Sequence, residues 1–455
     1  MTKRKKSGFA LKAFFLSILL HGILPAPSQC AEMASPAPGA VVIQPGEQNG
    51  EKPLTVDEAV RIALENHPRI KTARERVGAQ QAVLGQQLGA YYPTISFNNQ
   101  YRTSTASGTT GVSPEASESY SSQATFNLTL YNFGKREGAV QSARETLDAT
   151  RYNFTTAIDD TVVGVKQAYY LYLAAKALVR VREEAVKSRD LIVRQAQGFY
   201  DVGTRAKIDV VRAEANLYTA QADLIAAENG AKVAWVTLKN AMGLLEYPER
   251  PVTVDLTIAP VPITLERAKD IAFSSRPELK SLEAQRKAQD QQIATARRGH
   301  LPDIIFDAFY GRRNSSDTGS DTFPLKPVWQ VQLGLNIPIF DGFRTTYRVE
   351  ETTRNYYAIK AQEEQQKEQV ALEVEQNYLR LDEARERIKA TAASERAAKE
   401  NLDLANGRYQ VGVGSIIEVT DAQSLYTDAQ TNHIRAQYDY KIAEAQLIRA
   451  IGRPL

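Results

Sequence analysis

The sequence predicts a mainly α-helical chain whose four short β-strands contribute to a membrane β-barrel. Three observations predict this fold class. Two stretches of roughly sixty residues space their apolar residues as long helices do, four segments of about ten residues alternate apolar and polar side chains, and the same order of segments occurs twice. Because a solenoid would repeat every few tens of residues, a single repetition indicates two large halves.

The first 30 residues are predicted to be a secretory signal peptide. Basic residues at positions 3–6 precede an apolar stretch at positions 9–24, which Pro25 and small residues follow. A buried N-terminal helix is the alternative. The 455-residue chain has a formal net charge of +3, but this segment carries five positive charges and no acidic residue. The remainder is near −2 (3 − 5), so charge gives no argument for a nucleic-acid partner.

Cys30 is the only cysteine and lies where the signal peptide would be cut. We expect cleavage near Cys30 or Ala31. Lipidation of Cys30 is the alternative, although Pro27 and Gln29 stand where a lipid-anchored start needs small residues. One cysteine allows no disulfide within the chain, so an exported fold must be held together by packing. The Pro/Gly-rich residues 31–53 are predicted to be a flexible lead.

The rest of the chain repeats itself once. His67-Pro68 recurs as Arg276-Pro277, 209 residues later (276 − 67), and Val202-Gly203 recurs at the same offset as Val411-Gly412. The same offset relates further positions: Tyr92-Pro93 and Leu301-Pro302, Tyr131-Asn132 and Phe340-Asp341, Val210 and Val419, Ala213 and Ala422, Gly243 and Gly452. An offset held over nearly the whole length predicts two tandem repeats, residues 54–243 and 263–453.

Each half opens with two helices. Thr55 and Glu58 have the spacing of a capping box at the start of the first helix, and the second half keeps Thr264 at the equivalent position. Pro68 and Pro277 then occupy the position where a proline best starts a helix. These second helices are expected to run to about residues 91 and 300.

Two alternating segments follow in each half. In the first half Ile95, Phe97 and Tyr101 alternate with polar residues, and in the second half Val331 and Leu333 do so. Ser/Thr/Gly-rich loops are predicted over residues 103–119 and 314–327. Aromatic residues lie at or near the strand ends: Tyr91, Tyr92, Tyr101, Tyr120, Tyr131, Tyr310, Trp329 and Phe340.

This pattern is typical of transmembrane barrel strands, whose aromatic residues lie at headgroup level. A soluble β-sandwich edge is the alternative. Four strands cannot close a barrel, and an open edge in lipid would leave backbone groups unsatisfied. The chain must therefore oligomerise if these strands span a membrane. Three copies would supply about twelve strands, enough to leave a lumen.

A helical period takes over from residue 135 to about residue 202, and again from residue 343 to about residue 411. Such helices would be on the order of 90 Å long, which does not fit inside a compact globule. Sharp turns at Gly203 and Gly412 are predicted to start return helices that end near Gly243 and Gly452. The many charges on these helices indicate solvated coiled-coil faces.

Residues 199–205 read FYDVGTR and precede Ile208-Asp209-Val210, and residues 408–415 read RYQVGVGS and precede Ile417-Glu418-Val419. Both segments resemble the helical-hairpin tips of the TolC-like outer membrane efflux protein family, also called outer membrane factors. The resemblance covers about residues 54–453. It implies a homotrimer with a twelve-stranded outer-membrane barrel and an α-helical periplasmic tunnel. Such a trimer provides the exit duct of a tripartite efflux or type I secretion system, with a periplasmic adaptor and an inner-membrane pump as partners.

The resemblance also implies two groups of site residues. The tips that dock the adaptor are Val202, Gly203, Thr204, Arg205, Val411, Gly412, Val413, Gly414 and Ser415. The pore constriction and gate are Glu418, Asp421, Tyr409 and Asp209.

The two halves differ at these positions. Arg212 stands in the first half where the second half has Asp421, so the second hairpin is expected to form the negative constriction. Two alternatives remain open: Glu418 belongs to a helix capping box with Ser415, and Tyr409 packs in the coiled coil. Gly414 occupies the place of an arginine expected near the gate, although Arg205 is present in the first turn.

Nothing in the sequence indicates an enzyme, a cofactor or a metal site. After the signal peptide only His67, His300 and His433 remain as histidines, far apart, and no thiol accompanies them. The chain is therefore predicted to be an outer-membrane conduit that extends into the periplasm. The alternative is a periplasmic coiled-coil adaptor or scaffold without its own pore, but adaptors have one helical hairpin rather than two hairpins and two strand pairs.

Overall fold

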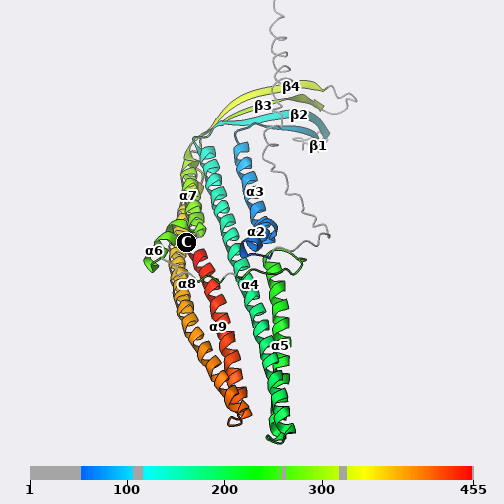
Figure 1. The fold of residues 1–455 in the computed structure, drawn as a ribbon. Coiled ribbons are helices and arrows are strands. Elements are labelled where there is room, and N and C mark those ends of the chain that lie inside the picture. The colour runs from blue at the N-terminus through cyan, green and yellow to red at the C-terminus, as the bar shows by residue number, and fades with distance from the viewer. Residues whose placement is uncertain (1–52, 106–115, 255, 259–262, 317–324, 453–455) are drawn as a thin grey trace, which may run out of the picture. The chain divides into compact units, whose positions relative to one another are not determined.

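The computed structural model describes residues 53–105, 116–254, 256–258, 263–316 and 325–452 (Figure 1). The predicted signal peptide, Cys30 and the predicted lead up to residue 52 lie outside these residues. The first half contains α2 (Val56–Asn66), α3 (Pro68–Gly89), β1 (Thr94–Thr105), β2 (Ala116–Tyr131), α4 (Lys135–Asp201) and α5 (Lys207–Ala241). The second half repeats this order with α6 (Leu265–Ser275), α7 (Pro277–Arg297), the short 3-10 helix η1 (Arg298–His300), β3 (Asp303–Ser316), β4 (Lys326–Asn336), α8 (Arg344–Gln410) and α9 (Ile416–Ile451).

The first helices of both halves begin as their capping residues predict. The Thr55 hydroxyl accepts a hydrogen bond from the Glu58 N–H at 3.1 Å, and Thr264 accepts one from the Arg267 N–H at 3.4 Å. His67 then caps α3, because its Nδ1 accepts a hydrogen bond from the Arg69 N–H at 3.1 Å. The chain therefore bends at His67, and it bends in the same way at Arg276, where an extended residue again precedes a proline.

A glycine at the end of each return helix packs against this bend. A Cβ on Gly243 would lie 2.6 Å from the Cα of His67, and a Cβ on Gly452 would lie 3.2 Å from the Cα of Arg276. Both glycines have a positive φ, 75° and 82° respectively. The close approach of helix end to bend is thus the same in both halves.

The two long helices, α4 and α8, each contain 67 residues, which corresponds to about 100 Å. Both begin after a left-handed residue, Gly134 and Phe343 respectively. Each packs along its return helix, α4 with α5 and α8 with α9, and α4 also packs against α3, α7 and α9. The two hairpins therefore lie side by side (Figure 1).

The four described strands form one antiparallel sheet in the order β1-β2-β3-β4 (Figure 1). Directly opposed residues share a face of the sheet, and the register opposes Phe97 to Ala124, Phe126 to Ala308 and Phe306 to Leu333. One face carries apolar residues on all four strands: Ile95, Phe97, Tyr101, Tyr120, Ala124, Phe126, Leu128, Ile304, Phe306, Ala308, Tyr310, Trp329, Val331, Leu333 and Leu335. We call this set the apolar face; much of it is exposed, with Phe97 at 71% and Leu333 at 68%. The polar residues Asn99, Ser122, Arg312 and Asn314 lie on the same face, toward the strand ends far from the helices.

The opposite face of the sheet is mainly polar, although it includes Ile305, Phe309 and Val328. The hydroxyls of Ser96 and Thr125 lie 2.6 Å apart, and the Asn127 amide donates a hydrogen bond to Asp307 on the next strand. The alternation predicted for these segments is therefore present. The predicted loops were too long, however, because the strands extend into them, from Thr103 to Thr105 and from Ala116 to Ser119 in the first pair.

The second pair shows the same correction, since β3 runs to Ser316 and β4 begins at Lys326. Ladder pairing uses backbone groups that every residue but proline can supply in full, so Ser/Thr-rich ends pair as well as apolar ones. The Ser/Thr-rich strand ends were therefore predicted as loops, because their side chains do not alternate.

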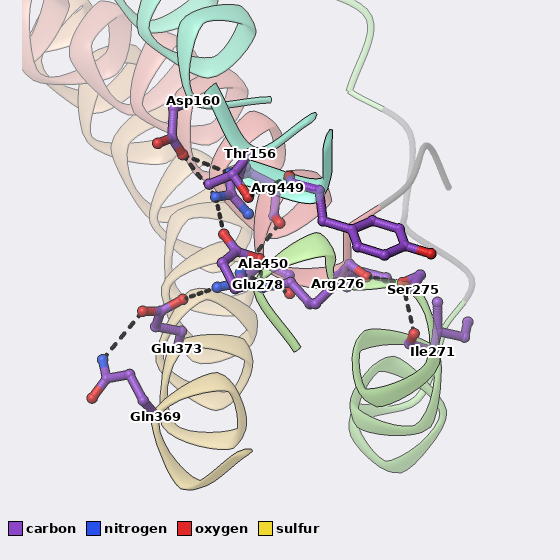
Figure 2. Close-up of polar contacts among 12 residues, drawn as sticks. Thr156, Asp160, Ile271, Ser275, Arg276, Glu278, Gln369, Glu373, Arg449 and Ala450 are labelled. Carbon is purple, nitrogen blue, oxygen red and sulfur yellow. Dashed lines mark hydrogen bonds and ion pairs between the residues drawn. The ribbon is translucent and has the colours of Figure 1, made fainter. Parts of the chain in front are cut away.

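An ion network around the buried Arg276 joins the two halves (Figure 2). Asp160 of α4 accepts hydrogen bonds from Arg449 of α9 at 2.8 Å and from Arg69 of α3 at 2.7 Å. Arg449 also pairs with Glu278 of α7. Arg276, only 3% exposed, lies 3.1 Å from Glu278 and 2.7 Å from Glu373 of α8. The network thus connects five helices from both halves.

Candidate functional site

The turn of each hairpin is built by the same backbone hydrogen bonds. In the first turn the Thr204 N–H donates to the Phe199 carbonyl at 2.9 Å and the Gly203 N–H to Tyr200 at 2.9 Å. In the second turn the Val413 N–H donates to Arg408 at 3.1 Å and the Gly412 N–H to Tyr409 at 3.1 Å. This is a Schellman motif, which requires a left-handed residue.

Gly203 and Gly412 supply that residue, with φ values of 74° and 86°. The structure therefore places both glycines where the sequence predicted a sharp turn. Most of the other predicted tip residues are exposed, including Val202 at 70%, Val411 at 74% and Val413 at 68%. Gly414 is buried, and Ser415 is half-buried and caps α9.

Arg205 links the first turn to the second. Its Nη2 donates hydrogen bonds to the carbonyls of Gly412 at 3.0 Å and Gly414 at 2.7 Å. Its guanidinium also lies over the Tyr409 ring, 5.4 Å from the centroid. We call these contacts the Arg205 clamp. Arg205 and Gly414 are themselves 209 residues apart (414 − 205), so equivalent positions of the two halves touch each other.

Gly414 leaves little room for a side chain. A Cβ there would lie 2.9 Å from the Cβ of Arg408 and from the backbone nitrogen of Tyr409. The sequence has Gly414 at the position where the family resemblance implies an arginine. It did not predict that the arginine of the other turn binds the carbonyl of this glycine.

Tyr409 belongs to an apolar cluster that both hairpins form near their tips. Its ring packs edge-on against Phe199, with centroids 5.6 Å apart, and it is 1% exposed. The other buried members of this cluster are Ile192, Ala196, Val210, Ala213, Leu402, Ala405, Ile416, Val419 and Ala422. The Tyr409 hydroxyl has no hydrogen-bond partner among the described residues. Burial raises the pKa of this hydroxyl, the Asp209 carboxylate raises it further, and Arg205 opposes the rise.

The predicted acidic residues have different environments. The Glu418 N–H donates to the Ser415 hydroxyl at 3.2 Å, as the capping interpretation expected, while the Glu418 carboxylate accepts a hydrogen bond from Arg408 Nε at 3.3 Å. Asp421 is exposed and forms no ion pair within the described part of the chain. Asp209 is half-buried in the first turn of α5, close enough to Tyr409 to act on its hydroxyl.

Sequence reasoning missed Arg408 as the partner of Glu418. The two residues lie on either side of the turn, ten positions apart, and only the turn geometry brings them together. Within a single chain, the negative charge of Glu418 is therefore partly balanced, whereas that of Asp421 is not.

Within the described ranges, no group of three or more His, Cys, Asp and Glu side chains could hold a metal ion. In the same ranges, no helix combines the length and the apolar composition that crossing a membrane requires.

Comparison with known families gives the decisive observation. The family described as outer membrane efflux protein matches residues 59–244 and again residues 270–453. The chain belongs to this family. It is accordingly an outer-membrane protein that reaches into the periplasm, and its family is one of channels rather than of enzymes.

Two relatives resemble the chain over most of their length. It is 25% identical to the protein CyaE of Bordetella pertussis over 415 residues, which covers 88% of this chain and 84% of CyaE. It is also 25% identical to the outer membrane protein TolC of Vibrio cholerae over 404 residues, covering 87% of this chain and 90% of TolC.

Solved structures of channels share the fold. The outer membrane channel CmeC of Campylobacter jejuni matches with a TM-score of 0.75 at 17% identity and covers 90% of each chain. The outer membrane protein VceC of Vibrio cholerae matches with a TM-score of 0.73 at 18% identity, covering 88% of this chain and 96% of VceC. The predicted mainly helical fold with four antiparallel strands per chain is thereby confirmed.

Proposed function

We propose that three copies of the chain form an outer-membrane exit duct, with a twelve-stranded barrel above an α-helical periplasmic tunnel. The observation that carries this proposal is the apolar face of the sheet. An exposed apolar surface over four adjacent strands suits lipid. The described sheet has two free edges, β1 and β4, and lipid does not tolerate unpaired edges. Pairing β4 of one copy with β1 of the next would close the sheet, and three copies leave room for a lumen.

Exposed apolar residues on the helices support the same assembly. On α5, Val211, Tyr218 and Ile225 recur every seven residues and are more than half exposed. On α8, Leu372 and Leu379 also lie seven residues apart and are at least half exposed. A seven-residue apolar repeat is what one helix presents to another in a coiled coil. Neighbouring copies would cover these stripes.

The turns of the two hairpins would form the closed periplasmic entrance. The Arg205 clamp holds the first turn against the second within each copy, and Tyr409 is buried behind it. Opening the entrance would separate the turns and break these contacts. Asp421 would then line the opening with negative charge, and Glu418, which Arg408 of its own turn partly balances, would add less. The exposed tip residues Val202, Val411 and Val413 would bind a periplasmic adaptor.

We propose that such a duct works with an adaptor and an inner-membrane pump in tripartite efflux or type I secretion. The relatives CyaE and TolC and the efflux protein BepC of Brucella suis support this role. A periplasmic scaffold without a pore is not favoured, because a scaffold in water would not expose the apolar face.

Single-channel recording of the purified protein in planar bilayers tests the proposal. We expect stable openings that prefer cations. Glu418→Ala/Asp421→Ala should weaken that preference. Asp421→Asn alone should weaken it more than Glu418→Gln alone, because Arg408 already balances Glu418. Folded protein that never conducts, even after Arg205→Ala, would overturn the duct.

A further inference from the structure

A cavity of about 440 Å³ lies beside the sheet, between the end of α3, the beginning of α4 and the end of α7. Leu88, Tyr91, Val140, Arg144 and Arg298 are among its lining residues, together with Glu137, Gly138, Gln141 and Gln291. All three helices pass into or out of strands within a few residues of this point. The cavity therefore lies at the level where the apolar face of the sheet begins.

The charge of this cavity is positive. Arg144 and Arg298 form no ion pair within the described part of the chain, and Arg298 donates a hydrogen bond to the Gly134 carbonyl at 2.8 Å. Glu137 is the only acidic lining residue. Its carboxylate is 3.7 Å from Arg136 Nε and accepts a hydrogen bond from the Tyr91 hydroxyl at 3.3 Å. Two arginines thus remain available for an anion.

Arg144 projects from the side of α4 that continues the apolar face. Lys135 pairs with Asp303 at 3.0 Å, and Asp303 opposes Asn336 on the polar face of the sheet. Lys135 therefore marks the polar side of α4. Arg144 follows nine residues later, and at about 100° per residue it projects from the opposite side of the helix. Arg144 consequently lies on the side of the apolar face, just beyond its edge.

Aromatic residues occupy the same level. The Arg136 guanidinium stacks over the Tyr91 ring at 3.9 Å from its centroid, and the rings of Tyr131 and Phe133 pack 4.8 Å apart at the end of β2. Tyrosine at the boundary between an apolar band and a polar surface is typical of the headgroup region of a membrane. Basic pockets at this depth bind anionic lipid headgroups.

We propose that this cavity is a binding site for the phosphate group of an anionic phospholipid in the periplasmic leaflet, held by Arg144 and Arg298. Guanidinium groups bind phosphate oxygens through paired, charge-assisted hydrogen bonds. Leu88 and Val140 would lie against the glycerol and upper acyl carbons. The inference rests on the proposed function, because it takes the apolar face to lie in lipid. Since α3 and α7 flank α4 within one chain, a neighbouring copy at the sheet edges would leave the cavity open.

Lipid titration in detergent tests this site independently of conductance. The purified full chain is titrated with phosphatidylglycerol, and bound lipid is counted by native mass spectrometry. Arg144→Gln/Arg298→Gln should weaken binding about thirtyfold, or roughly fivefold for each arginine. Arg151→Gln is the matched control, because Arg151 lies two turns further along α4 and pairs with Asp148. It should change binding by less than about twofold.

Four outcomes would overturn the lipid site. The double variant could bind phosphatidylglycerol as the parent protein does, or phosphatidylcholine could bind equally well and independently of both arginines. Inorganic phosphate could bind at the same concentrations as the lipid and displace it, which would assign the site to free phosphate. If the double variant unfolds, Arg144→Gln alone serves, because no hydrogen bond or ion pair of the described residues depends on Arg144. A protein that conducts but binds no phosphatidylglycerol overturns this inference and leaves the duct intact.

Discussion

The two hairpin turns share one backbone conformation but differ in their side chains. Both use a Schellman motif around a left-handed glycine. Tyr200 and Tyr409 occupy equivalent positions, yet Tyr200 is 41% exposed and Tyr409 is 1% exposed. Arg205 and Gly414 are also equivalent, and one binds the other. The turn geometry is therefore kept in both halves, while the side chains have become complementary to each other.

The bends between the first and second helices of each half also share a backbone conformation and differ in their side chains. Both bends pack against a glycine at the end of a return helix. In the first half His67 caps α3 through one local hydrogen bond. In the second half Arg276 reaches two carboxylates and lies within the network of Figure 2. At equivalent positions of the repeat, His67 thus caps a helix locally, whereas Arg276 belongs to the network that connects the two halves.

Replacing Arg276 and His67, the two bend residues, should give the largest difference in stability of the variants considered. Arg276→Ala leaves Glu278 and Glu373 without this buried partner, and breaking a buried pair costs about 3–5 kcal/mol. His67→Ala removes a helix cap and costs about 1 kcal/mol. Thermal unfolding of the detergent-solubilised protein, followed by circular dichroism, should show a much lower midpoint for Arg276→Ala. Equal midpoints for the two variants would contradict the assignment of the network as the link between halves.

The Arg205 clamp should give the next largest effect, on gating rather than on stability. Hydrogen bonds to a charged group contribute about 1.5–3 kcal/mol, so Arg205→Ala should favour the open entrance about tenfold or more in each copy. The measurement is open probability in planar bilayers. Arg212→Ala is the matched control, because Arg212 is exposed and forms no ion pair among the described residues.

Arg205→Lys should fall between the parent and Arg205→Ala, since one ammonium group cannot reproduce both the paired carbonyl contacts and the stacking on Tyr409. If Arg212→Ala opens the channel as much as Arg205→Ala, the effect would come from net charge at the tips. The clamp would then have no special role.

Local chemistry explains how much of the fold the sequence could predict. The first long helix was expected over residues 135–202 and runs from Lys135 to Asp201, because a helical period, a turn glycine and its own backbone bonds are all local. The strand interiors were predicted from alternation in the same way. The strand ends were missed because Ser/Thr-rich residues carry no alternation, although their backbones pair.

The site was predicted less completely, because its important contacts join distant segments. The turn glycines followed from backbone requirements alone. That Arg205 binds Gly414, and that Arg408 balances Glu418, depends on how the hairpins pack and on the path of the second turn. No spacing rule contains this information. The roles assigned to Tyr409, Asp209, Glu418 and Asp421, and the exact bounds of the two repeats, stay predictions.

The smallest effect should come from the Tyr409 hydroxyl. This hydroxyl is buried without a hydrogen-bond partner among the described residues, so Tyr409→Phe should change stability at pH 7 by less than about 1 kcal/mol. Tyr200→Phe, at the exposed equivalent position, should change it even less.

The two variants should diverge in alkali. Burial, with Asp209 adding to it, raises the pKa of Tyr409 in the folded chain, whereas an unfolded tyrosine ionises near pH 10. Below about pH 10 the Tyr409 hydroxyl is neutral in both the folded and the unfolded chain, so its ionisation does not affect stability. Above about pH 10 the unfolded chain releases this proton more readily, so the free energy of unfolding falls as the pH rises through the folded pKa. Tyr409→Phe cannot ionise, so its unfolding midpoint should exceed that of the parent increasingly above about pH 10, while Tyr200→Phe should follow the parent. Parallel curves for all three proteins from about pH 8 to pH 11 would mean that water reaches Tyr409, and that the tips of the two hairpins are looser than their packing indicates.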